Sequence, residues 1–344
     1  MNKTKNTLFS NKPVTIDENS LIMALESSCD ETACAIVKGG REVLANVVAS
    51  QIKTHEEYGG VIPEIAARMH LEAVNVVVEE AFKQAGRING NDISAFAGTV
   101  GPGLVGCLLV GMNAAKSLAL AYDKPFIGIN HLNAHLAANF IDTDLEPPFI
   151  ALLVSGGHTQ IIEMKSYSDI EIIGETIDDA VGEAYDKVAR LIGLPYPGGP
   201  KLDKMAQEGN PFAFKLPEGK VDGYNFSFSG LKTAVLRLVK SFDGKDLPTA
   251  DICASFQECV SSTLYKKVKR AAEERGYKQV VLAGGVAANS EIRKKIFSLE
   301  YEGYKVFAPQ MKYCTDNASM VASAAFFFEN TFDNVDVEVF SRAG

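Results

Sequence analysis

The chain has 344 residues, of which 47% are hydrophobic and 22% are charged, and its formal net charge is −9. That length exceeds what a single hydrophobic core normally serves, so we expect two domains in contact. The composition excludes extended disorder, and the negative charge excludes a basic field over the whole protein that would attract nucleic acid. The longest apolar runs, such as 104–110, are too short to cross a bilayer, so we expect no membrane segment.

Residues 1–20 are polar and rich in Lys, Asn and Ser. They lack the pattern of a signal peptide and the arginines of a transit peptide, so we expect a disordered extension. The six cysteines form no Cys-x-x-Cys pair and are too sparse for a disulfide scaffold. This usage indicates reduced thiols in a reducing compartment, and we expect a cytoplasmic protein.

An internal repeat begins directly after this extension. Residues 21–37 (LIMALESSCDETACAIV) have the pattern of an apolar strand, a Ser-rich turn and a second apolar strand. Residues 148–164 (PFIALLVSGGHTQIIEM) have the same pattern, and Ser155 stands at the place of Ser28. Apolar runs bounded by Ser, Gly and Asp predict a β-hairpin in each case.

The repeat continues further along both halves of the chain. Segments 93–103 and 278–289 each predict a strand that ends in a Gly-rich turn. The next strands, at 124–130 and 304–310, each lead into a helix of small residues, and this alignment sets His135 against Asp316. We expect a duplicated α/β fold whose domains, 21–145 and 146–335, face each other across a cleft, with sites at strand ends.

Helical periodicity separates these strands. Apolar residues recur at helical spacing in 61–85, with charged residues on the other face, and segments 178–193 and 251–275 behave similarly. The stretch 194–230 is rich in Pro and Gly and predicts a loop-rich insertion in the second domain. Such a segment is a candidate binding surface.

The two hairpin turns, LESSCDET and LVSGGHTQ, are candidate phosphate sites. Hydroxyls and backbone N–H groups in such turns can gather around an anion, and two turns can grip a phosphate chain between them. Each turn alone is weak evidence, because Ser and Gly favour hairpin turns on conformational grounds. Their occurrence at equivalent places in the repeat favours the functional interpretation.

His131 and His135 are candidate metal ligands. They lie four residues apart at the start of a predicted helix, so both imidazoles share one face. A lone His-x-x-x-His pair is often two unrelated histidines, but the chain has only five, and the repeat adds Asp316 from the opposite half. Two His and one carboxylate suit Fe²⁺ or Zn²⁺. Leu132 stands where a zincin protease has its glutamate base, which disfavours a protease.

Segment 284–289 (GGVAAN) opens a helix after an apolar strand, and its small residues would let a flat ring approach the backbone. Asn289 can then hydrogen-bond an adenine or a ribose, although an ordinary tight β–α turn explains the glycines equally. Asp186, together with Gly199 and Asp203 near the PGGP loop, can receive ribose hydroxyls. The acidic residues 178–186 are otherwise a solvated helix face.

Taken together, the chain resembles the bacterial tRNA threonylcarbamoyladenosine transferase family, TsaD, formerly called O-sialoglycoprotein endopeptidase. The resemblance covers about 21–330 and depends on nine ordered motifs. They are LESSCDETA, HEEYGGVIPEIAARMH, GTVGPGLVG, NHLNAHLAA, LLVSGGHTQ, GEAYDKVARLIGLPYPGGP, FSFSGLKTA, GGVAAN and CTDNA. It implies an actin/hexokinase/heat-shock ATPase-like (ASKHA) fold. This chain differs from the family pattern in two places. Asn133 and Ala134 replace the expected Glu-Gly, and the tail 1–20 has no counterpart in the family.

The resemblance also implies a site and a reaction. The reaction is transfer of a threonylcarbamoyl group from threonylcarbamoyl-AMP to N6 of adenosine 37 in tRNAs that read codons beginning with A. The implied metal ligands are His131, His135 and Asp316, with Fe²⁺ favoured over Zn²⁺. Acidic residues near the active centre are Asp30 and Glu31. The implied contacts to the adenylate are Val154, Ser155, Gly156, Gly157, His158, Asp186, Gly199, Asp203 and Asn289.

The family's partners are a paralogous TsaB-type subunit and a small TsaE-type ATPase, with tRNA as the substrate. Because the whole chain is acidic, tRNA binding requires a partner or a local basic patch. Candidate cations are Arg68, Lys187, Arg190, Lys201, Lys204 and Lys232.

Two other functions remain open on the sequence. A small-molecule kinase of the same fold would need Mg²⁺ and a catalytic aspartate but no His pair. An actin-like or chaperone-like nucleotide switch would need no transition metal, so metal content separates both from the transferase.

Overall fold

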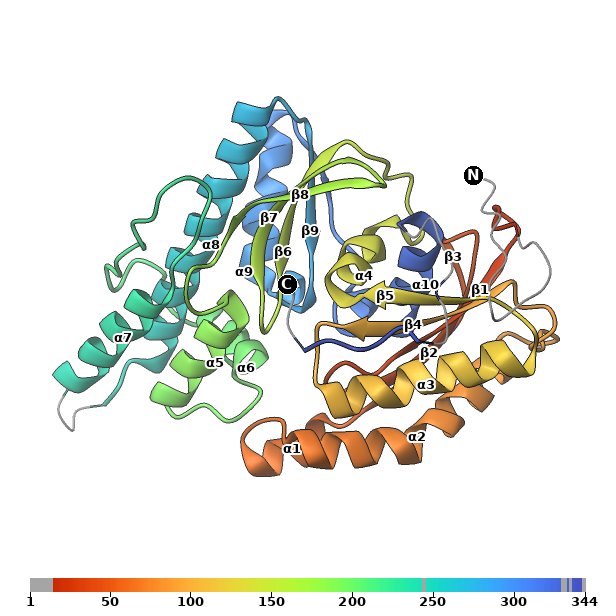
Figure 1. The fold of residues 1–344 in the computed structure, drawn as a ribbon. Coiled ribbons are helices and arrows are strands. Elements are labelled where there is room, and N and C mark those ends of the chain that lie inside the picture. Colours follow the sequence, from red (N-terminus) through yellow and green to blue (C-terminus); the bar gives the residue numbers. More distant parts are fainter. Residues whose placement is uncertain (1–14, 243–245, 329–332, 334–335, 342–344) are drawn as a thin grey trace. The chain divides into compact units, whose positions relative to one another are not determined.

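The computed structural model describes residues 15–242, 246–328, 333 and 336–341, so the extension expected at 1–20 lies almost wholly outside the described residues. Contacts divide the chain into two compact units: unit 1 is Met1–Leu145 with Asp316–Gly344, and unit 2 is Glu146–Thr315. Each unit contains one five-stranded sheet with helices packed on it (Figure 1). Within these described ranges, no helix has both the length and the apolar character needed to cross a membrane.

The sheet of unit 1 has the strand order β3-β2-β1-β4-β5. β1 and β2 form the expected hairpin, with Leu21 opposite Lys38 and Glu26 opposite Ala33, whereas β4 and β5 are parallel to β1. Both members of this hairpin are apolar because both faces of the sheet are covered. The strands are β1 (Leu21–Glu26), β2 (Glu31–Lys38), β3 (Glu42–Ser50), β4 (Ala95–Gly101) and β5 (Phe126–Asn130).

Helices cover both faces of this sheet (Figure 1). They are α1 (Ile52–Tyr58), α2 (Pro63–Gln84), α3 (Val105–Ala121), α4 (His131–Ala137) and α10 (Ala318–Phe327). Along β2, Cys34 and Ile36 pack in the core shared with α2 and α3, and Ala33 and Ala35 pack against α10. This alternation is the two-residue period of a strand.

Helix α10 corrects one expectation from the repeat. The sequence alignment assigned 316–335 to the second domain, but α10 packs on α4 and β1, and Asp316 therefore belongs to unit 1. The physical reason is burial, because all residues from Ala318 to Ala325 are buried against unit 1. Asp316 is thus a neighbour of His135 in the same unit, and not its counterpart in the opposite one.

The sheet of unit 2 repeats the topology of unit 1, with the order β10-β9-β6-β7-β8. β6 and β7 form the second expected hairpin, with Phe149 opposite Met164 and Val154 opposite Thr159, and β9 is parallel to β6. The duplication inferred from the sequence is therefore confirmed at the level of strand order. The strands are β6 (Phe149–Val154), β7 (Thr159–Ser166), β8 (Asp169–Glu175), β9 (Gln279–Ala283) and β10 (Lys305–Phe307).

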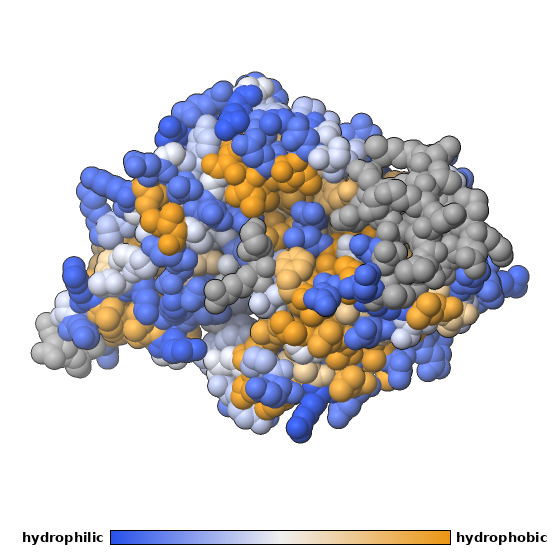
Figure 2. All heavy atoms as spheres, viewed as in Figure 1, coloured by the Kyte–Doolittle hydropathy of each residue, from blue (hydrophilic) through white to orange (hydrophobic). Residues whose placement is uncertain are grey.

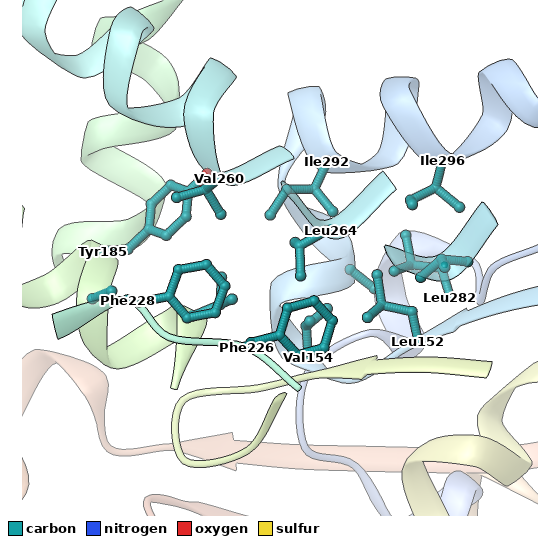
Figure 3. Close-up of a cluster of buried hydrophobic side chains, with 14 of the residues drawn as sticks. Leu152, Val154, Tyr185, Phe226, Phe228, Val260, Leu264, Leu282, Ile292 and Ile296 are labelled. Atoms are coloured by element: carbon teal, nitrogen blue, oxygen red, sulfur yellow. The ribbon is translucent and has the colours of Figure 1, made fainter. Parts of the chain in front are cut away.

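Figure 3 shows the core of unit 2, in which Leu152, Val154 and Leu282 from the sheet meet side chains from the helices. The helices are α5 (Val181–Leu191), α6 (Gly198–Ala206), α7 (Ser229–Ser241), α8 (Thr249–Arg275) and α9 (Ser290–Phe297). The stretch 194–230, predicted to be loop-rich, contains the helix at 198–206. A helix forms there because Leu202 and Ala206, four residues apart, are buried on one side.

Candidate functional site

His131 and His135 are presented by the first turns of α4 in unit 1. Asn130 ends β5 and caps the helix, because its side-chain oxygen accepts hydrogen bonds from the N–H groups of Leu132 (2.8 Å) and Asn133 (3.3 Å). The two histidines are four positions apart in the helix, so their rings lie on one face, with ring centroids 4.6 Å apart and ring planes at 75°. The strand-to-helix junction therefore fixes both imidazoles.

Asp316 completes a group that can hold a metal ion. Its Oδ1 lies 3.3 Å from Nε2 of His135 and 3.6 Å from Nε2 of His131, and one ligand atom from each residue lies within 4.8 Å of the others. Asn317 follows it and caps α10 by accepting from the N–H of Met320, at 3.2 Å. Two imidazoles and one carboxylate are a donor set that suits Fe²⁺ or Zn²⁺.

The charges in this group depend on one another. Burial opposes ionisation of Asp316, but His131 and His135 outweigh it and lower the pKa of the carboxyl to about 2. Burial would lower the pKa of His131, but Asp316 and Glu26 outweigh it and raise that pKa to about 9. Electrostatically, the pocket favours positive charge beside Asp316, which is what a divalent cation supplies.

Glu26, which belongs to none of the predicted sites, contacts the Nδ1 side of the His131 ring. It is fully buried at the end of β1, and its Oε2 lies 3.2 Å from Nδ1 of His131. Thr99 donates to the same oxygen at 2.6 Å, and the N–H of Ser28 donates to Oε1 at 2.5 Å. A glutamate that ends an otherwise apolar strand was the sequence signal that would have identified it.

Asp30 lies in the turn that joins β1 to β2, and Glu31 is the first residue of β2. Burial, followed by the charges of Asp316 and Asp30, raises the pKa of Glu31 to about 9, although its Oε1 accepts from Ser50 Oγ at 3.1 Å. The raised pKa favours the protonated form of Glu31, which makes it a candidate hydrogen-bond donor. The influence of Asp316 on it shows that this turn and the His/Asp group share one electrostatic environment.

In unit 2 the turn at 155–158 is closed by its own hydrogen bonds. The N–H of Ser155 donates to the carbonyl of His158 at 2.9 Å, and the N–H of His158 donates to Ser155 Oγ at 3.1 Å. A Cβ atom on Gly156 or Gly157 would meet no atom within 4 Å, so both glycines border open space. The side chain of Val154 is instead buried in the core (Figure 3), so only its backbone can face a ligand.

Asp186 and Gly199 come together through the start of α6. The Oδ1 of Asp186 accepts from the N–H of Gly198 at 2.8 Å and of Gly199 at 3.1 Å. Burial raises the pKa of Asp186, and these two hydrogen bonds act in the opposite direction. The carboxylate therefore caps the helix, which explains why α6 begins inside the Pro/Gly-rich stretch.

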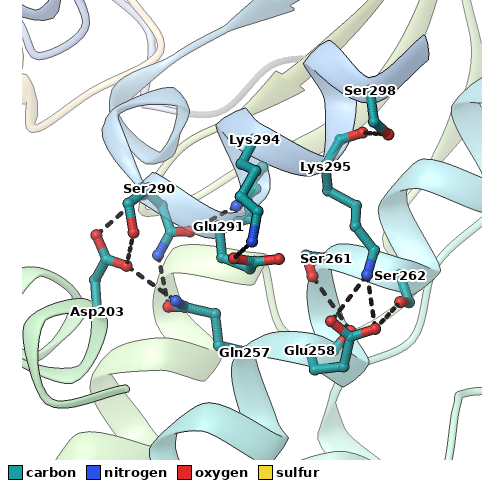
Figure 4. A network of polar contacts seen from close by, with 12 residues as sticks. Asp203, Gln257, Glu258, Ser261, Ser262, Ser290, Glu291, Lys294, Lys295 and Ser298 are labelled. Atoms are coloured by element: carbon teal, nitrogen blue, oxygen red, sulfur yellow. Dashed lines mark hydrogen bonds and ion pairs between the residues drawn. The ribbon is translucent and has the colours of Figure 1, made fainter. Parts of the chain in front are cut away.

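Asp203 and Asn289 belong to one network, shown in Figure 4, that the sequence did not reveal as such. Gln257 connects them: its Nε2 donates to Asp203 at 3.0 Å, and its Oε1 accepts from Asn289 at 3.0 Å. Asp203 also accepts from the N–H (3.0 Å) and hydroxyl (2.7 Å) of Ser290. Beside this network lies a hollow of about 580 Å³, which Gln257, Glu291 and others line. Gln257 lies within a long helical pattern, which gave no signal of its role.

The candidate cations differ in their surroundings. Lys187 forms ion pairs with Asp179 at 2.6 Å and Glu183 at 2.7 Å, so its charge is already balanced. Lys201 donates to the carbonyl of Tyr196 at 2.6 Å. Arg68 and Lys204 are exposed. Lys187 is therefore a weak candidate for a contact with phosphate.

Solved structures with a similar fold define the class of protein. The crystal structure of full-length HypF in the phosphate- and nucleotide-bound form has a TM-score of 0.62 at 16% identity, covering 91% of this chain and 47% of that one. Component A of (R)-2-hydroxyglutaryl-CoA dehydratase from Acidaminococcus fermentans has a TM-score of 0.52 at 15% identity, covering 90% and 96%. At such identities the likeness concerns the fold alone. The chain is an α/β protein of the duplicated ASKHA type with a possible metal site in unit 1.

Sequence relatives define the family. The family model described as TsaD, tRNA N6-adenosine threonylcarbamoyltransferase, matches residues 42–323. A protein of that name from Picosynechococcus is 50% identical over 336 residues, covering 94% of each chain. Another from Clostridium perfringens is 52% identical over 313 residues, covering 89% of this chain and 92% of that one. The chain belongs to the TsaD family, a family of transferases, as its motifs predicted.

Proposed function

We propose that this chain transfers the threonylcarbamoyl group of threonylcarbamoyl-AMP to N6 of adenosine 37 in tRNAs that read codons beginning with A. The observation that carries the proposal is the His131–His135–Asp316 group, within a chain about 50% identical to enzymes named for this transfer. The group is built within unit 1, by α4 after β5 and by the bend that precedes α10.

For the metal, we propose that His131, His135 and Asp316 are the three protein ligands, with Fe²⁺ favoured over Zn²⁺. The fit is supported by the donor set, by the short separations and by the low pKa of Asp316, which keeps the carboxylate ionised. When bound, the metal would hold and polarise the carbonyl of the acyl donor. The chain's own contribution is orientation, because Glu26 holds Nδ1 of His131 and thereby turns Nε2 toward Asp316.

For the nucleotide, we propose that Ser155, Gly156, Gly157 and His158 approach the phosphate and that the backbone of Val154 lies beside it. Open space at the two glycines and the N–H groups of a tight turn support this assignment. Asp186, Gly199, Asp203 and Asn289 would hold ribose and base. Hydrogen bonds to Gln257, Gly198 and Ser290 already fix these side chains, so the site is preorganised for ligand binding.

For proton transfer, we propose that the Asp30–Glu31 pair acts on the adenine amine. An exocyclic amine is a weak nucleophile and must lose a proton during acyl transfer. Burial and the charges of Asp316 and Asp30 raise the pKa of Glu31, so Glu31 is suited to donate a hydrogen bond, and the neighbouring Asp30 is the proposed acceptor. The two neighbouring carboxyl groups thereby take different roles.

For partners, we propose a TsaB-type paralogue, a TsaE-type ATPase and tRNA, in the cytoplasm. Unit 1 carries exposed apolar side chains on α2 and α3, each between 41% and 64% exposed, which is a surface suited to a protein partner. Part of this surface, over α3, is orange in Figure 2. The residues are Leu71, Val76, Val105, Leu109 and Leu120.

The test is reconstitution with purified chain, both partner proteins, synthetic threonylcarbamoyl-AMP and an unmodified tRNA transcript. Mass spectrometry of the tRNA nucleosides should detect threonylcarbamoyladenosine, and a transcript with guanosine at position 37 should stay unmodified. Loss of the modified nucleoside from cells depleted of this chain should accompany that result. Modified tRNA in depleted cells, with no product in vitro, would contradict the proposal.

A further inference from the structure

The segment HEEYGGVIPEIAARMH contains two completely buried histidines, His55 and His70, that the proposed chemistry does not use. His70 lies on α2, which packs along β2 and β3 in unit 1 (Figure 1). Both ring nitrogens of His70 have partners. Nε2 lies 3.0 Å from the backbone carbonyl of Cys29, and Nδ1 lies 2.7 Å from Oγ1 of Thr32.

These contacts determine the tautomer of His70. A carbonyl oxygen can only accept, so Nε2 must carry the hydrogen that bonds to Cys29. Burial lowers the pKa of His70, which keeps the ring neutral at pH 7 despite the nearby Glu26 and Asp30. Nδ1 is then an acceptor, and the hydroxyl of Thr32 donates to it. One buried side chain thus joins the residues on both sides of Asp30 and Glu31.

Other contacts hold the same turn in place. The N–H of Gln51 donates to the carbonyl of Asp30 at 3.0 Å, and Gln51 Oε1 lies 3.2 Å from Nε2 of His55. On the opposite side, the N–H of Leu104 donates to the carbonyl of Ser28 at 2.8 Å. The two histidines of the segment therefore contact the turn in succession, His70 directly and His55 through Gln51.

We propose that His70 is a positioning residue for the transfer reaction: from α2, it holds the β1–β2 turn so that Asp30 and Glu31 stay fixed beside the His131–His135–Asp316 group. This inference deepens the proposed function and rests on it. His70 touches neither a ligand nor the metal-ligand candidates in the described contacts. Its effect passes through Cys29 and Thr32, and its loss should affect the chemical step while substrate binding is retained.

The experiment uses Cys29 as a reporter of the turn. Burial, and then the charge of Asp30, raises the pKa of its thiol, so alkylation by iodoacetamide should be slow in the wild-type chain. Peptide mapping by mass spectrometry would follow Cys29 in the full-length protein. Cys259, a partly buried free thiol of unit 2, serves as an internal control.

In His70→Leu, alkylation of Cys29 should accelerate by about tenfold, because a less ordered turn exposes the thiol and favours its thiolate. Alkylation of Cys259 should not change. The value of kcat should fall by roughly 10- to 100-fold with KM for the donor unchanged, because small displacements of catalytic groups have effects of this size. His70→Gln retains a donor near Nε2 and should recover part of both losses. Metal content should match that of the wild type in both variants.

Val77→Ala provides the control for general loosening, because Val77 is buried on α2 within the core shared with the sheet. It should lower the thermal midpoint without changing the Cys29 rate. If His70→Leu does not fold, Thr32→Val and Thr32→Ser replace it, since only the serine keeps the hydroxyl that His70 accepts from.

Unchanged alkylation of Cys29 in a folded His70→Leu or Thr32→Val variant would overturn the positioning role. An equal acceleration in Val77→Ala would also overturn it. The wild-type chain could prove inactive on tRNA while His70→Leu still accelerates alkylation of Cys29 and not of Cys259. The proposed function would then be wrong, but the role of His70 in ordering the β1–β2 turn would be supported. The two inferences are therefore tested separately.

Discussion

Glu26 contacts Nδ1 of His131 at 3.2 Å from a fully buried position, and this contact leaves Nε2 of the same ring directed at Asp316. A carboxylate that accepts from one imidazole nitrogen fixes the ring and strengthens the other nitrogen as a ligand. His135 has no equivalent in the described hydrogen bonds, because its buried Nδ1 has no partner there. The two histidines are therefore supported unequally.

The first prediction concerns this support. Glu26→Gln should weaken metal binding by about 10- to 100-fold, since an amide neither balances nor orients His131 as a carboxylate does. Competitive titration against a chelator of known affinity, with metal analysis, measures the change. Glu72→Gln, an exposed change on α2, is the matched control. Wild-type affinity in Glu26→Gln would mean that the contact has no role in the metal site.

The second prediction concerns the ligands themselves. The double variant His131→Ala with His135→Ala should remain folded and lose bound metal, because only Asp316 of the three proposed ligands remains. Circular dichroism reports the fold, and elemental analysis of the purified protein reports the metal. A stoichiometric metal ion in the folded double variant would place the site elsewhere. A wild-type chain without transition metal would contradict the proposed metal site.

The third prediction concerns the phosphate turn of unit 2. Gly156→Val should leave the thermal midpoint nearly unchanged, since a Cβ there meets no atom within 4 Å. Affinity for AMP should fall by at least about tenfold, or ~1.4 kcal/mol, because the new side chain occupies the space assigned to the phosphate. Titration calorimetry measures this. Gly230→Val, at another open glycine of the same unit, is the control and should not weaken the binding of AMP. Equal affinity for AMP in Gly156→Val and wild type would refute the assignment.

The fourth prediction is a pH dependence that arises from His70. Burial lowers the folded-state pKa below the ordinary value of about 6.5, so below that pH the unfolded chain binds a proton that the folded chain does not. Stability contributed by neutral His70 is present above pH 6.5 and is lost as the pH falls. The hydrogen bond to Cys29 and the charges of Glu26 and Asp30 reduce the effect, and His55 increases it.

The measurement is the unfolding free energy from denaturant titrations between pH 5 and 8, for wild type and His70→Gln. The difference between the two should change with pH below 6.5 by at most about 1.4 kcal/mol per pH unit, the limit for one proton. The comparison cancels the titration of the other groups. Parallel curves would show that His70 is protonated equally in both states.

The fifth prediction concerns tRNA. Because the net charge is −9, the isolated chain should bind tRNA weakly, and the partner subunit should strengthen binding. Lys204→Glu should weaken tRNA binding and reduce its dependence on salt, whereas Lys240→Glu, a charge-matched exposed change, should not. Filter binding over a salt series measures both. Tight binding by the chain alone that is indifferent to Lys204→Glu would require another surface.

The family, the repeat and most of the local elements follow from local sequence patterns. Strands such as 21–26 and 149–154 are continuous apolar runs, and the turns between hairpin strands are marked by Ser and Gly, so local composition was sufficient. His131 and His135 were found for the same reason, since helical spacing alone places them on one face. The helix at Gly198–Ala206 was missed because its cap, Asp186, lies on another helix.

The packing of the folded chain determines which distant residues meet. It joined Asp316 to unit 1 through the buried helix α10, where the repeat had suggested the opposite half. It also revealed Glu26 behind His131, Gln257 between Asp203 and Asn289, and His70 beside Cys29. Such contacts depend on how helices pack against a sheet, and no pattern of neighbouring residues encodes them. A buried polar side chain must find partners, and the identity of those partners is a property of the folded chain.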